Sequence, residues 1–293
     1  MATAAQWIQG ARPRTLPAAI APVLIGTAAA FEMDAFKPVN AILAALVALL
    51  LQVGVNYAND YSDGIRGTDE DRVGPLRLVG SGAAKPEMVK RAAFAAFGLA
   101  MLFGLVLVLI TQAWWLLLVG VGCVMAAWGY TGGKNPYGYM GLGDVFVFVF
   151  FGLVATLGTT YTQAGQISLP AIIGAIGTGL IACALLMANN VRDIPTDMQA
   201  GKKTLAVRLG DKHARESYVL MLAVAILLVI VLAPSRPWML IVLLLIPASL
   251  MPSWLMINGR KRKSLIPVLK QTGMINLGYS VLFSLGLVLS HGL

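Results

Sequence analysis

Charged residues are scarce in this 293-residue chain and make up only 12% of it. A soluble globular protein usually carries about 25% Asp, Glu, Lys and Arg, so this chain has half the charge that a water-facing surface normally needs. Cysteine and histidine are scarcer still, with two residues of each. Cys123 and Cys183 lie inside apolar stretches, and His213 is far from His291. These shortages argue against an ordinary soluble domain, a disulfide framework and a zinc or histidine-rich metal site.

Long apolar stretches are what the chain has in abundance, since 58% of its residues are hydrophobic. A helix needs roughly 20 apolar residues to cross the hydrocarbon core of a bilayer, and stretches of that length recur from end to end. We therefore expect residues 1–293 to form a single all-α membrane domain of about nine transmembrane helices. The expected spans are Leu16–Phe31, Val39–Val55, Ala92–Ile110, Ala113–Trp128, Val145–Gln163, Leu169–Ala188, Tyr218–Ala233, Trp238–Ile257 and Ile266–Ser290.

The distribution of basic residues predicts the orientation of these spans. The net charge is +9, and cytoplasmic loops of membrane proteins are rich in Lys and Arg. If the N-terminus is cytoplasmic and the spans alternate, every Lys and Arg except Lys37 and Arg236 falls in a cytoplasmic segment. This bias predicts a multi-pass protein of the cell membrane with a cytoplasmic N-terminus. It also explains the basic charge without nucleic acid, which we exclude as a partner.

Two long polar loops, Asn56–Arg91 and Asn189–Arg215, are expected on the cytoplasmic side. The first opens with N-Y-A-N-D-Y-S-D-G-I-R-G-T-D-E-D-R, and the second opens with N-N-V-R-D-I-P-T-D. Where the preceding helix persists, acids three or four residues apart share one face. This spacing pairs Asp60 with Asp63 in the first loop and the two acids of the second loop with each other. An ordinary solvated loop would explain one such segment, but two at matching positions favour a site.

Clustered carboxylates repel one another unless a cation lies between them. Oxygen ligands without His or Cys favour a hard ion, and Mg²⁺ is usually held by one or two carboxylates together with substrate phosphates. We therefore predict that Mg²⁺ binds Asp60, Asp63, Asp193 and Asp197. Nearby basic side chains would neutralise the remaining phosphate charge. These are Arg66, Arg72, Arg77, Arg192, Lys202 and Lys203.

A third cytoplasmic turn, Y-T-G-G-K-N-P-Y-G-Y-M-G-L-G-D, runs from Tyr130 to Asp144. Tyr137 and Tyr139 are either interfacial tyrosines or an aromatic wall beside the diphosphate. Lys134 is a further candidate for substrate binding. Asp144 stands at the mouth of a long apolar helix, and we expect it to orient the acceptor or to act as a base.

Taken together and in this order, these motifs resemble the UbiA superfamily of intramembrane prenyltransferases. The resemblance extends to A-R-P-R-T-L-P-A-A-I-A-P at Ala11–Pro22, R-V-G-P-L-R-L-V-G-S-G at Arg72–Gly82 and G-K-K-T-L-A-V-R-L-G after the second acidic motif. Where the wider superfamily has the third acid of its first motif, this chain has Gly67, and Asp69 follows two residues later. That departure is similar to the branch that uses 1,4-dihydroxy-2-naphthoate, and it weakens the hydroxybenzoate reading.

The resemblance implies a bundle of nine spans around a central cavity that opens sideways for a lipid tail. It implies transfer of a polyprenyl group from polyprenyl diphosphate to 1,4-dihydroxy-2-naphthoate with loss of the carboxylate, which gives demethylmenaquinone. Arg192 and Lys202 or Lys203 would neutralise the leaving group, and the rings of Tyr137 and Tyr139 would stabilise the allylic cation. The residues implied in diphosphate and Mg²⁺ binding are Asn56, Asn59, Asp60, Asp63, Asp69, Asn189, Asn190, Asp193 and Asp197.

Two other interpretations remain open from the sequence. The same scaffold could use another aromatic acceptor, such as 4-hydroxybenzoate. A secondary transporter could couple ions through intramembrane acids, but it would need broken helices at mid-membrane, whereas the acids here gather toward one face.

Overall fold

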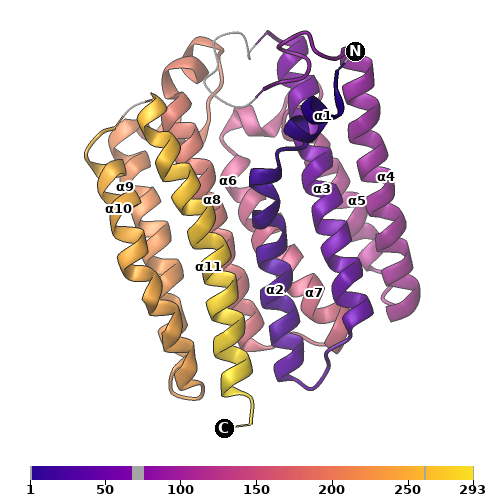
Figure 1. The fold of residues 1–293 in the computed structure, drawn as a ribbon, viewed down its shortest axis with the longest axis vertical. Helices are drawn as coiled ribbons and strands as arrows, with labels where there is room; N and C mark the ends of the chain where they lie inside the picture. Colours follow the sequence, from indigo (N-terminus) through magenta and orange to yellow (C-terminus); the bar gives the residue numbers. More distant parts are fainter. Residues whose placement is uncertain (1, 68–75, 261, 293) are drawn as a thin grey trace.

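The structure, a computed structural model, describes residues 2–67, 76–260 and 262–292. Over these residues the regular secondary structure is entirely helical. Figure 1 shows the helices aligned along one axis, with the N-terminus near one end and the C-terminus at the other. The helices are α1 (Ala4–Ala11), α2 (Leu16–Glu32), α3 (Pro38–Ile65), α4 (Pro86–Thr111), α5 (Leu116–Gly129), α6 (Gly143–Val147), α7 (Ala155–Ala164), α8 (Leu169–Gln199), α9 (Leu205–Leu227), α10 (Leu245–Ile257) and α11 (Ile266–Ser290).

The prediction of an all-α, multi-span membrane protein is confirmed. Among the described residues, eight helical segments are long and apolar enough to cross a membrane. A further apolar helix, α5, is shorter at 14 residues. Together they match the nine expected spans one for one. The span from Gly143 to Ala164 is built from α6, a π-helical segment (Phe148–Val154) and α7.

The predicted starts of the two polar loops are wrong. Helix α3 continues from Asn56 through Ile65, and α8 continues from Asn189 through Gln199. Hydropathy falls at these points, but the helical backbone continues, in α8 even through Pro195. The chain leaves the helical path only around Gly67 and Gly201, which have φ of 69° and 70°. Glycine adopts such left-handed conformations without a steric penalty. Both acidic motifs are therefore carried on rigid helix ends.

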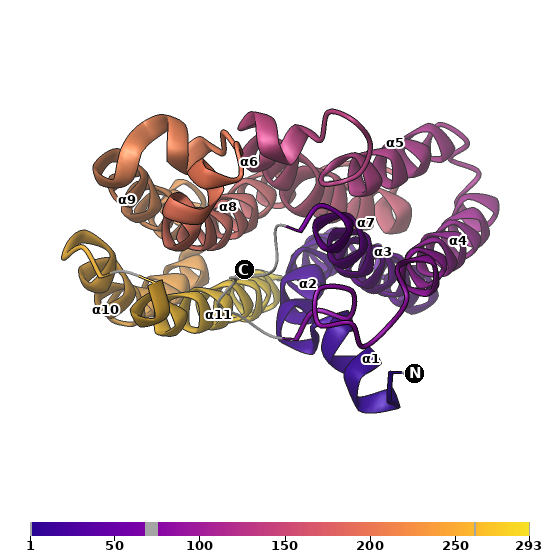
Figure 2. The same ribbon diagram turned by 90° about the horizontal axis from the view of Figure 1, so that it is seen from above.

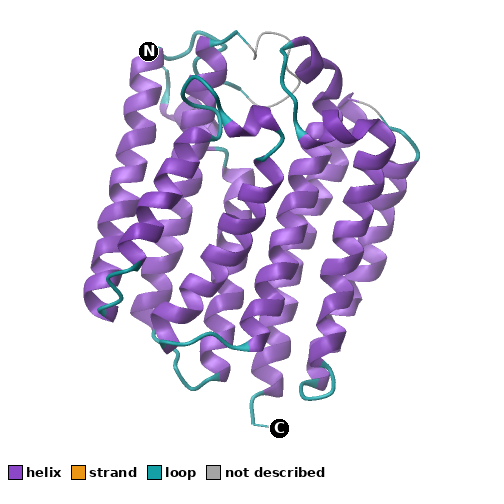
Figure 3. Ribbon diagram, turned by 180° about the vertical axis from the view of Figure 1, so that it is seen from behind, coloured by secondary structure: helices purple, strands orange, loops and turns teal. Residues whose placement is uncertain are grey.

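The ends of α3 and α8 lie at the same end of the bundle, which we call the motif end. Figure 3 shows the connections gathered at the two ends of the helices, with the C-terminus at the end opposite the motifs. The connection between α10 and α11 also lies at the motif end, because α11 runs from there to the C-terminus. Which end faces the cytoplasm, and whether a central cavity opens sideways, stay predictions.

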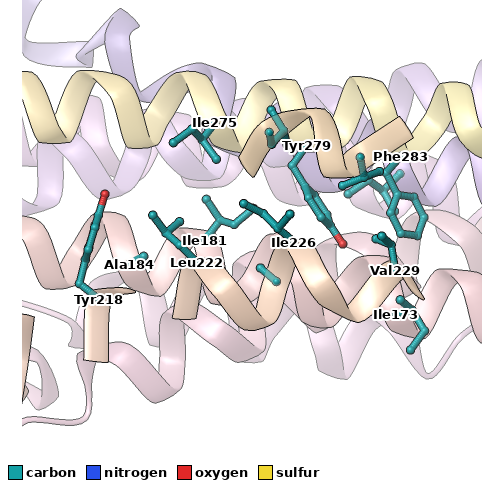
Figure 4. Packing of buried hydrophobic residues seen from close by; sticks show 14 of the residues in the cluster. Ile173, Ile181, Ala184, Tyr218, Leu222, Ile226, Val229, Ile275, Tyr279 and Phe283 are labelled. Atoms are coloured by element: carbon teal, nitrogen blue, oxygen red, sulfur yellow. The ribbon is translucent and has the colours of Figure 1, made fainter. Parts of the chain in front are cut away.

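Three buried clusters hold the bundle together, a minor one between α2, α3 and α4 and two main ones. The larger one joins α8, α9 and α11, with Tyr218, Tyr279 and Phe283 fully buried in it (Figure 4). The smaller one joins α1, α3 and α4 around Tyr57, Leu78 and Phe97. In a bilayer, close backbone approach through small residues favours such packing.

One close approach fixes the π-helical segment against α8. A Cβ atom added at Gly152 would lie 2.7 Å from the Cα of Gly179 and 2.8 Å from the carbonyl oxygen of Ala175. Only glycine fits at this crossing. The contact sets the position of α6 and of the turn that precedes it, and that turn contributes to the site described next.

Candidate active site

Asp60 and Asp63 lie on the last turns of α3, and both are buried. The Asp60 carboxylate accepts hydrogen bonds from the backbone amides of Leu78 (2.8 Å) and Val79 (3.0 Å). Gly64 makes this contact possible, because a Cβ there would lie 2.4 Å from the Val79 side chain. Asp60 thus fastens the returning chain to α3. Each carboxylate oxygen still has a second lone pair for another partner.

Asp63 is the point at which three segments distant in sequence meet. The Tyr139 hydroxyl donates a hydrogen bond of 2.7 Å to its Oδ1. The Lys202 Nζ lies 3.6 Å from the same oxygen, and an Arg77 nitrogen lies 3.7 Å from Oδ2. A buried carboxylate is stable only when it is paired and hydrogen-bonded, and these groups meet that requirement. The site therefore gathers positive charge around a buried acid.

Lys202 links the two acidic motifs. Its backbone amide donates to the carbonyl oxygen of Asp197 at 2.8 Å, while its ammonium reaches Asp63 and lies 4.4 Å from the centre of the Tyr139 ring. Burial lowers the pKa of Lys202, but the charges of Asp63, Tyr139 and Asp197 outweigh it and raise the pKa overall. Lys202 is therefore cationic at neutral pH. The prediction that the two motifs lie at one end of the bundle holds in the structure.

In the second motif, Arg192 and the adjacent Asp193 form an ion pair. Arg192 donates to both carboxylate oxygens of Asp193, at 2.7 and 2.6 Å, in a bidentate pair. Asp197 follows one turn later on the same helix and is buried. Such paired geometry is strong because the planar guanidinium matches a carboxylate, and it matches a phosphate equally well. Arg192 can therefore release the Asp193 carboxylate and bind a phosphate group in the same geometry.

The turn before α6 brings Tyr139 into the site and turns Tyr137 away from it. Tyr139 belongs to a short 3₁₀ segment (Tyr137–Met140), and its carbonyl oxygen accepts a hydrogen bond from the amide of Lys203 at 2.9 Å. Burial and the charge of Asp63 raise the pKa of the Tyr139 hydroxyl, so it remains a proton donor at neutral pH. Tyr137 instead donates to the Ala126 carbonyl and stacks on Phe146, with the ring centres 3.9 Å apart.

Arg66 and Thr131 complete the connection between α3 and this turn. Arg66 donates to the carbonyl oxygens of Thr131 and Gly133, and its guanidinium lies 5.3 Å from the centre of the Tyr139 ring. The Thr131 hydroxyl donates to Asn59 Oδ1 at 2.8 Å. Sequence reasoning missed Thr131, although it stands directly after Tyr130 in the motif-bearing turn. It holds the Asn59 side chain in a fixed orientation beside Asp60.

Several predicted site residues are placed elsewhere or make other contacts. The Asn56 amide donates to the Ala11 carbonyl (2.9 Å) and to the Thr15 hydroxyl (3.0 Å), which ties α3 to the start of α2. Asn189 donates within its own helix to Leu185. Lys134 is exposed, and Asn190 is half-buried on α8. Asp69 and Arg72 lie outside the described residues.

Asp144 is a further buried acid, five residues after Tyr139 in the chain. It lies in the first turn of α6 and is 7% exposed. Neither carboxylate oxygen has a hydrogen-bond partner in the described part of the chain, while its backbone carbonyl accepts from the Cys183 thiol at 3.2 Å. Because few residues separate Asp144 from Tyr139, their Cα atoms are within about 18 Å. An unpaired buried carboxylate is costly, so this position is a candidate for a functional role.

The donor set suits Mg²⁺ that arrives together with a diphosphate. Within the described residues, no three Asp, Glu, His or Cys side chains form a ready metal centre. Mg²⁺ does not need such a centre, because it commonly uses one or two carboxylates and completes its shell with water and phosphate oxygens. The carboxylates of Asp60, Asp63, Asp193 and Asp197 are hard oxygen ligands at one end of the bundle. They fit the predicted cofactor.

The fold and the site are those of a multi-span helical membrane protein with buried acids and basic side chains at one end of the bundle. Residues 19–278 match the UbiA prenyltransferase family, and the chain belongs to that family. A protein from Mycobacterium tuberculosis named 1,4-dihydroxy-2-naphthoate octaprenyltransferase is 53% identical, with 96% of each chain covered. A protein of the same name from Escherichia coli is 38% identical over 97% of this chain and 96% of its own.

Solved structures share the fold at much lower sequence identity. A UbiA homolog from Archaeoglobus fulgidus bound to GPP and Mg²⁺ has a TM-score of 0.70 at 16% identity, with 98% of this chain and 100% of that chain covered. The apo structure of a UbiA homolog from Aeropyrum pernix K1 has a TM-score of 0.70 at 17% identity, with 92% and 97% covered. These likenesses establish the architecture.

Proposed function

We propose that the protein transfers a polyprenyl group from polyprenyl diphosphate to 1,4-dihydroxy-2-naphthoate, with loss of the carboxylate as CO₂, to give demethylmenaquinone. The observation that carries the proposal is the Asp63 node, where Tyr139, Lys202 and Arg77 converge on a buried acid and connect it to the second motif. The names of the relatives at 53% and 38% identity support the same acceptor. The membrane lipids supply the solvent for the donor's tail.

Mg²⁺ is the proposed cofactor, and when bound it neutralises the charge that develops on the departing diphosphate. Its ligands would come from Asp60, Asp63, Asp193 and Asp197, together with Asp69. Two solved structures of a UbiA homolog from Archaeoglobus fulgidus hold Mg²⁺, one with DMAPP and one with GPP. Here Lys202 supplies the positive charge between the acids. Asp63 would be one of the side chains that hold the ion, which would leave the Lys202 ammonium available for the phosphate.

Basic side chains would then bind the phosphate oxygens. Lys202 has a compact ammonium on a flexible stem, so it can leave Asp63 and donate to an oxygen of the leaving group. Arg77 and Arg192 are already held against carboxylates by their guanidinium groups, and both can contact a phosphate in the same bidentate way. Preorganised cations of this kind favour the state in which charge has moved onto the diphosphate.

Tyr139 would stabilise the allylic carbocation that forms when the carbon–oxygen bond breaks. Its ring already faces two cations, with the Lys202 ammonium 4.4 Å and the Arg66 guanidinium 5.3 Å from the ring centre. An aromatic face attracts a cation most strongly where water is absent. Burial at the motif end provides that environment, and it also protects the carbocation from capture by water.

Asp144 would act on the acceptor. The naphthoate ring becomes a stronger nucleophile when one of its hydroxyl groups loses a proton, and a buried carboxylate with both oxygens unpaired can accept that proton. The ring carbon then forms a bond to the allylic carbon, and the carboxylate at the same carbon leaves as CO₂ with its electron pair returning to the ring. In this proposal Asp144 activates the acceptor, while other residues bind the diphosphate.

The proposal also covers location. The basic residues are concentrated in the segments that meet at the motif end, which supports a cell membrane location with the site facing the cytoplasm. The substrates are the lipid donor and the aromatic acceptor, and nucleic acid is not a partner.

A panel of donors and acceptors, with products identified by mass spectrometry, tests this function. The purified protein should form demethylmenaquinone from 1,4-dihydroxy-2-naphthoate and release diphosphate only when Mg²⁺ is present. Product from 4-hydroxybenzoate alone would move the protein to another branch of the family. A secondary transporter would release no diphosphate with any acceptor.

A further inference from the structure

A group of basic side chains at the α10–α11 connection has no role in the proposed reaction. Arg260, Arg262, Lys263 and Lys270 are exposed, and none of them forms an ion pair within the described residues. In Figure 2, α10 and α11 lie side by side at one edge of the bundle, while α3 and α4 lie toward the other. At the motif end, this group lies on the α10–α11 side of the bundle, and its segment Arg262–Leu265 also contacts α8.

Arg215 holds the connection in place and leaves those four side chains unpaired. Its guanidinium is buried and donates to the carbonyl oxygens of Met256 (2.8 Å) and Arg260 (3.0 Å). Its own charge is paired with Asp211, at 2.9 Å. Arg215 thus fixes the chain at the end of α10, and its own charge is not available to an external anion.

A groove of about 590 Å³ lies on α11 directly below this connection. It is lined by Ile266, Pro267, Lys270, Gln271 and Met274. Apart from Lys270 and the Gln271 amide, the lining is apolar, and Ile266 and Met274 are 43% and 65% exposed. Lys270 lines the groove, and Arg262 and Lys263 precede it in the chain; we call these three the basic rim, and Ile266, Pro267 and Met274 the apolar floor.

Helix α10 borders the same region. The Gln271 amide approaches the sulfur of Met251 on α10 at 3.6 Å, and Trp254, one turn closer to the connection, is 57% exposed. Exposed tryptophan is typical of the headgroup level of a bilayer. This places the basic rim beside lipid headgroups and the floor beside lipid tails.

We propose that this groove binds one anionic diacyl phospholipid. Lys270, Arg262 and Lys263 hold its phosphate, and one acyl chain lies along Ile266 and Met274. The positive charge of these three side chains favours an anionic lipid over other molecules that could fill the groove. A second copy of the chain would bring an identical basic group and be repelled, and a neutral lipid would leave the cations unpaired. Basic pockets between transmembrane helices bind anionic headgroups in this way.

Native mass spectrometry of the protein in detergent, titrated with phosphatidylglycerol or with phosphatidylcholine of the same acyl chains, tests the site. We expect one phosphatidylglycerol to bind saturably and more tightly than phosphatidylcholine. Each basic residue near a membrane surface contributes roughly a 5-fold effect, so the variant with Lys270→Gln, Arg262→Gln and Lys263→Gln should bind on the order of 100-fold more weakly. Its prenyl transfer in detergent without added lipid should match that of the unmodified protein.

The matched control is Lys85→Gln with Arg91→Gln, two exposed basic residues at the start of α4. This variant should retain the bound phosphatidylglycerol. Equal loss in both variants, or equal binding of both lipids, would mean a general attraction to basic surfaces and would overturn the proposal. Displacement of the lipid by a polyprenyl diphosphate would also overturn it, because the groove would then belong to the substrate.

Discussion

Replacing Tyr139 with phenylalanine removes one hydroxyl group and leaves the ring in place. The lost hydrogen bond, 2.7 Å long, goes to Asp63, while Lys202 at 3.6 Å and Arg77 at 3.7 Å remain. A hydrogen bond to a charged group contributes about 1.5–3 kcal/mol. If that bond orients Asp63 throughout the reaction, kcat/KM should fall roughly 10- to 150-fold. The ring remains for the carbocation, so activity should decrease without vanishing.

The assay is Mg²⁺-dependent release of diphosphate from polyprenyl diphosphate with 1,4-dihydroxy-2-naphthoate as acceptor. Tyr139→Leu should be slower than Tyr139→Phe, since it removes the aromatic face as well. The control is Tyr218→Phe, which loses a buried 2.6 Å hydrogen bond with Thr272. That variant should lose about 1 kcal/mol of stability and keep its kcat/KM. Unchanged kcat/KM and Mg²⁺ dependence in Tyr139→Phe would refute the role given to this hydroxyl.

Three further perturbations probe the acids and the packing. Asp63→Asn or Asp193→Asn should lower turnover by at least ~1,000-fold with the helical circular dichroism unchanged, and near-normal activity would remove that residue from the Mg²⁺ site. Asp144→Asn should slow product formation roughly 100-fold but leave binding of a prenyl diphosphate analogue intact; lost binding would contradict its role on the acceptor. Gly152→Ala should lower the Tm, because its Cβ would lie 2.7 Å from the α8 backbone at a cost of about 1–3 kcal/mol. Gly158→Ala enters open space and should leave the Tm unchanged.

The spans could be predicted from the sequence because the bilayer imposes a simple rule of length and hydropathy on each of them. The helix ends could not be read in the same way. Hydropathy marks where the hydrocarbon ends, whereas a helix ends where its backbone bonding stops. At Asn56 and Asn189 these two limits separate, and the helices continue as polar but largely buried turns. Gly67 and Gly201, both at positive φ, were the sequence signals for the true ends.

The candidate site could be predicted as a set of residues but not as a set of contacts. The i, i+3 and i, i+4 spacings correctly put Asp60 near Asp63 on one helical face. The hydrogen bond from Tyr139 joins residues 76 positions apart, and no local pattern encodes such a pairing. The same holds for the amides that Asp60 binds and for Thr131 on Asn59, since these depend on how the connections fold back over α3.

Binding of Mg²⁺ with a non-reactive prenyl diphosphate analogue, measured by calorimetry in Asp63→Asn, Asp197→Asn and the double variant, tests the shared site most directly. Each single change should remove most of the affinity, because the charges of both acids act on the same ammonium, that of Lys202. Residues that act as a unit are not additive, so the double variant should bind no more weakly than the worse single variant. Two losses that simply add would mean two independent sites and would contradict the account.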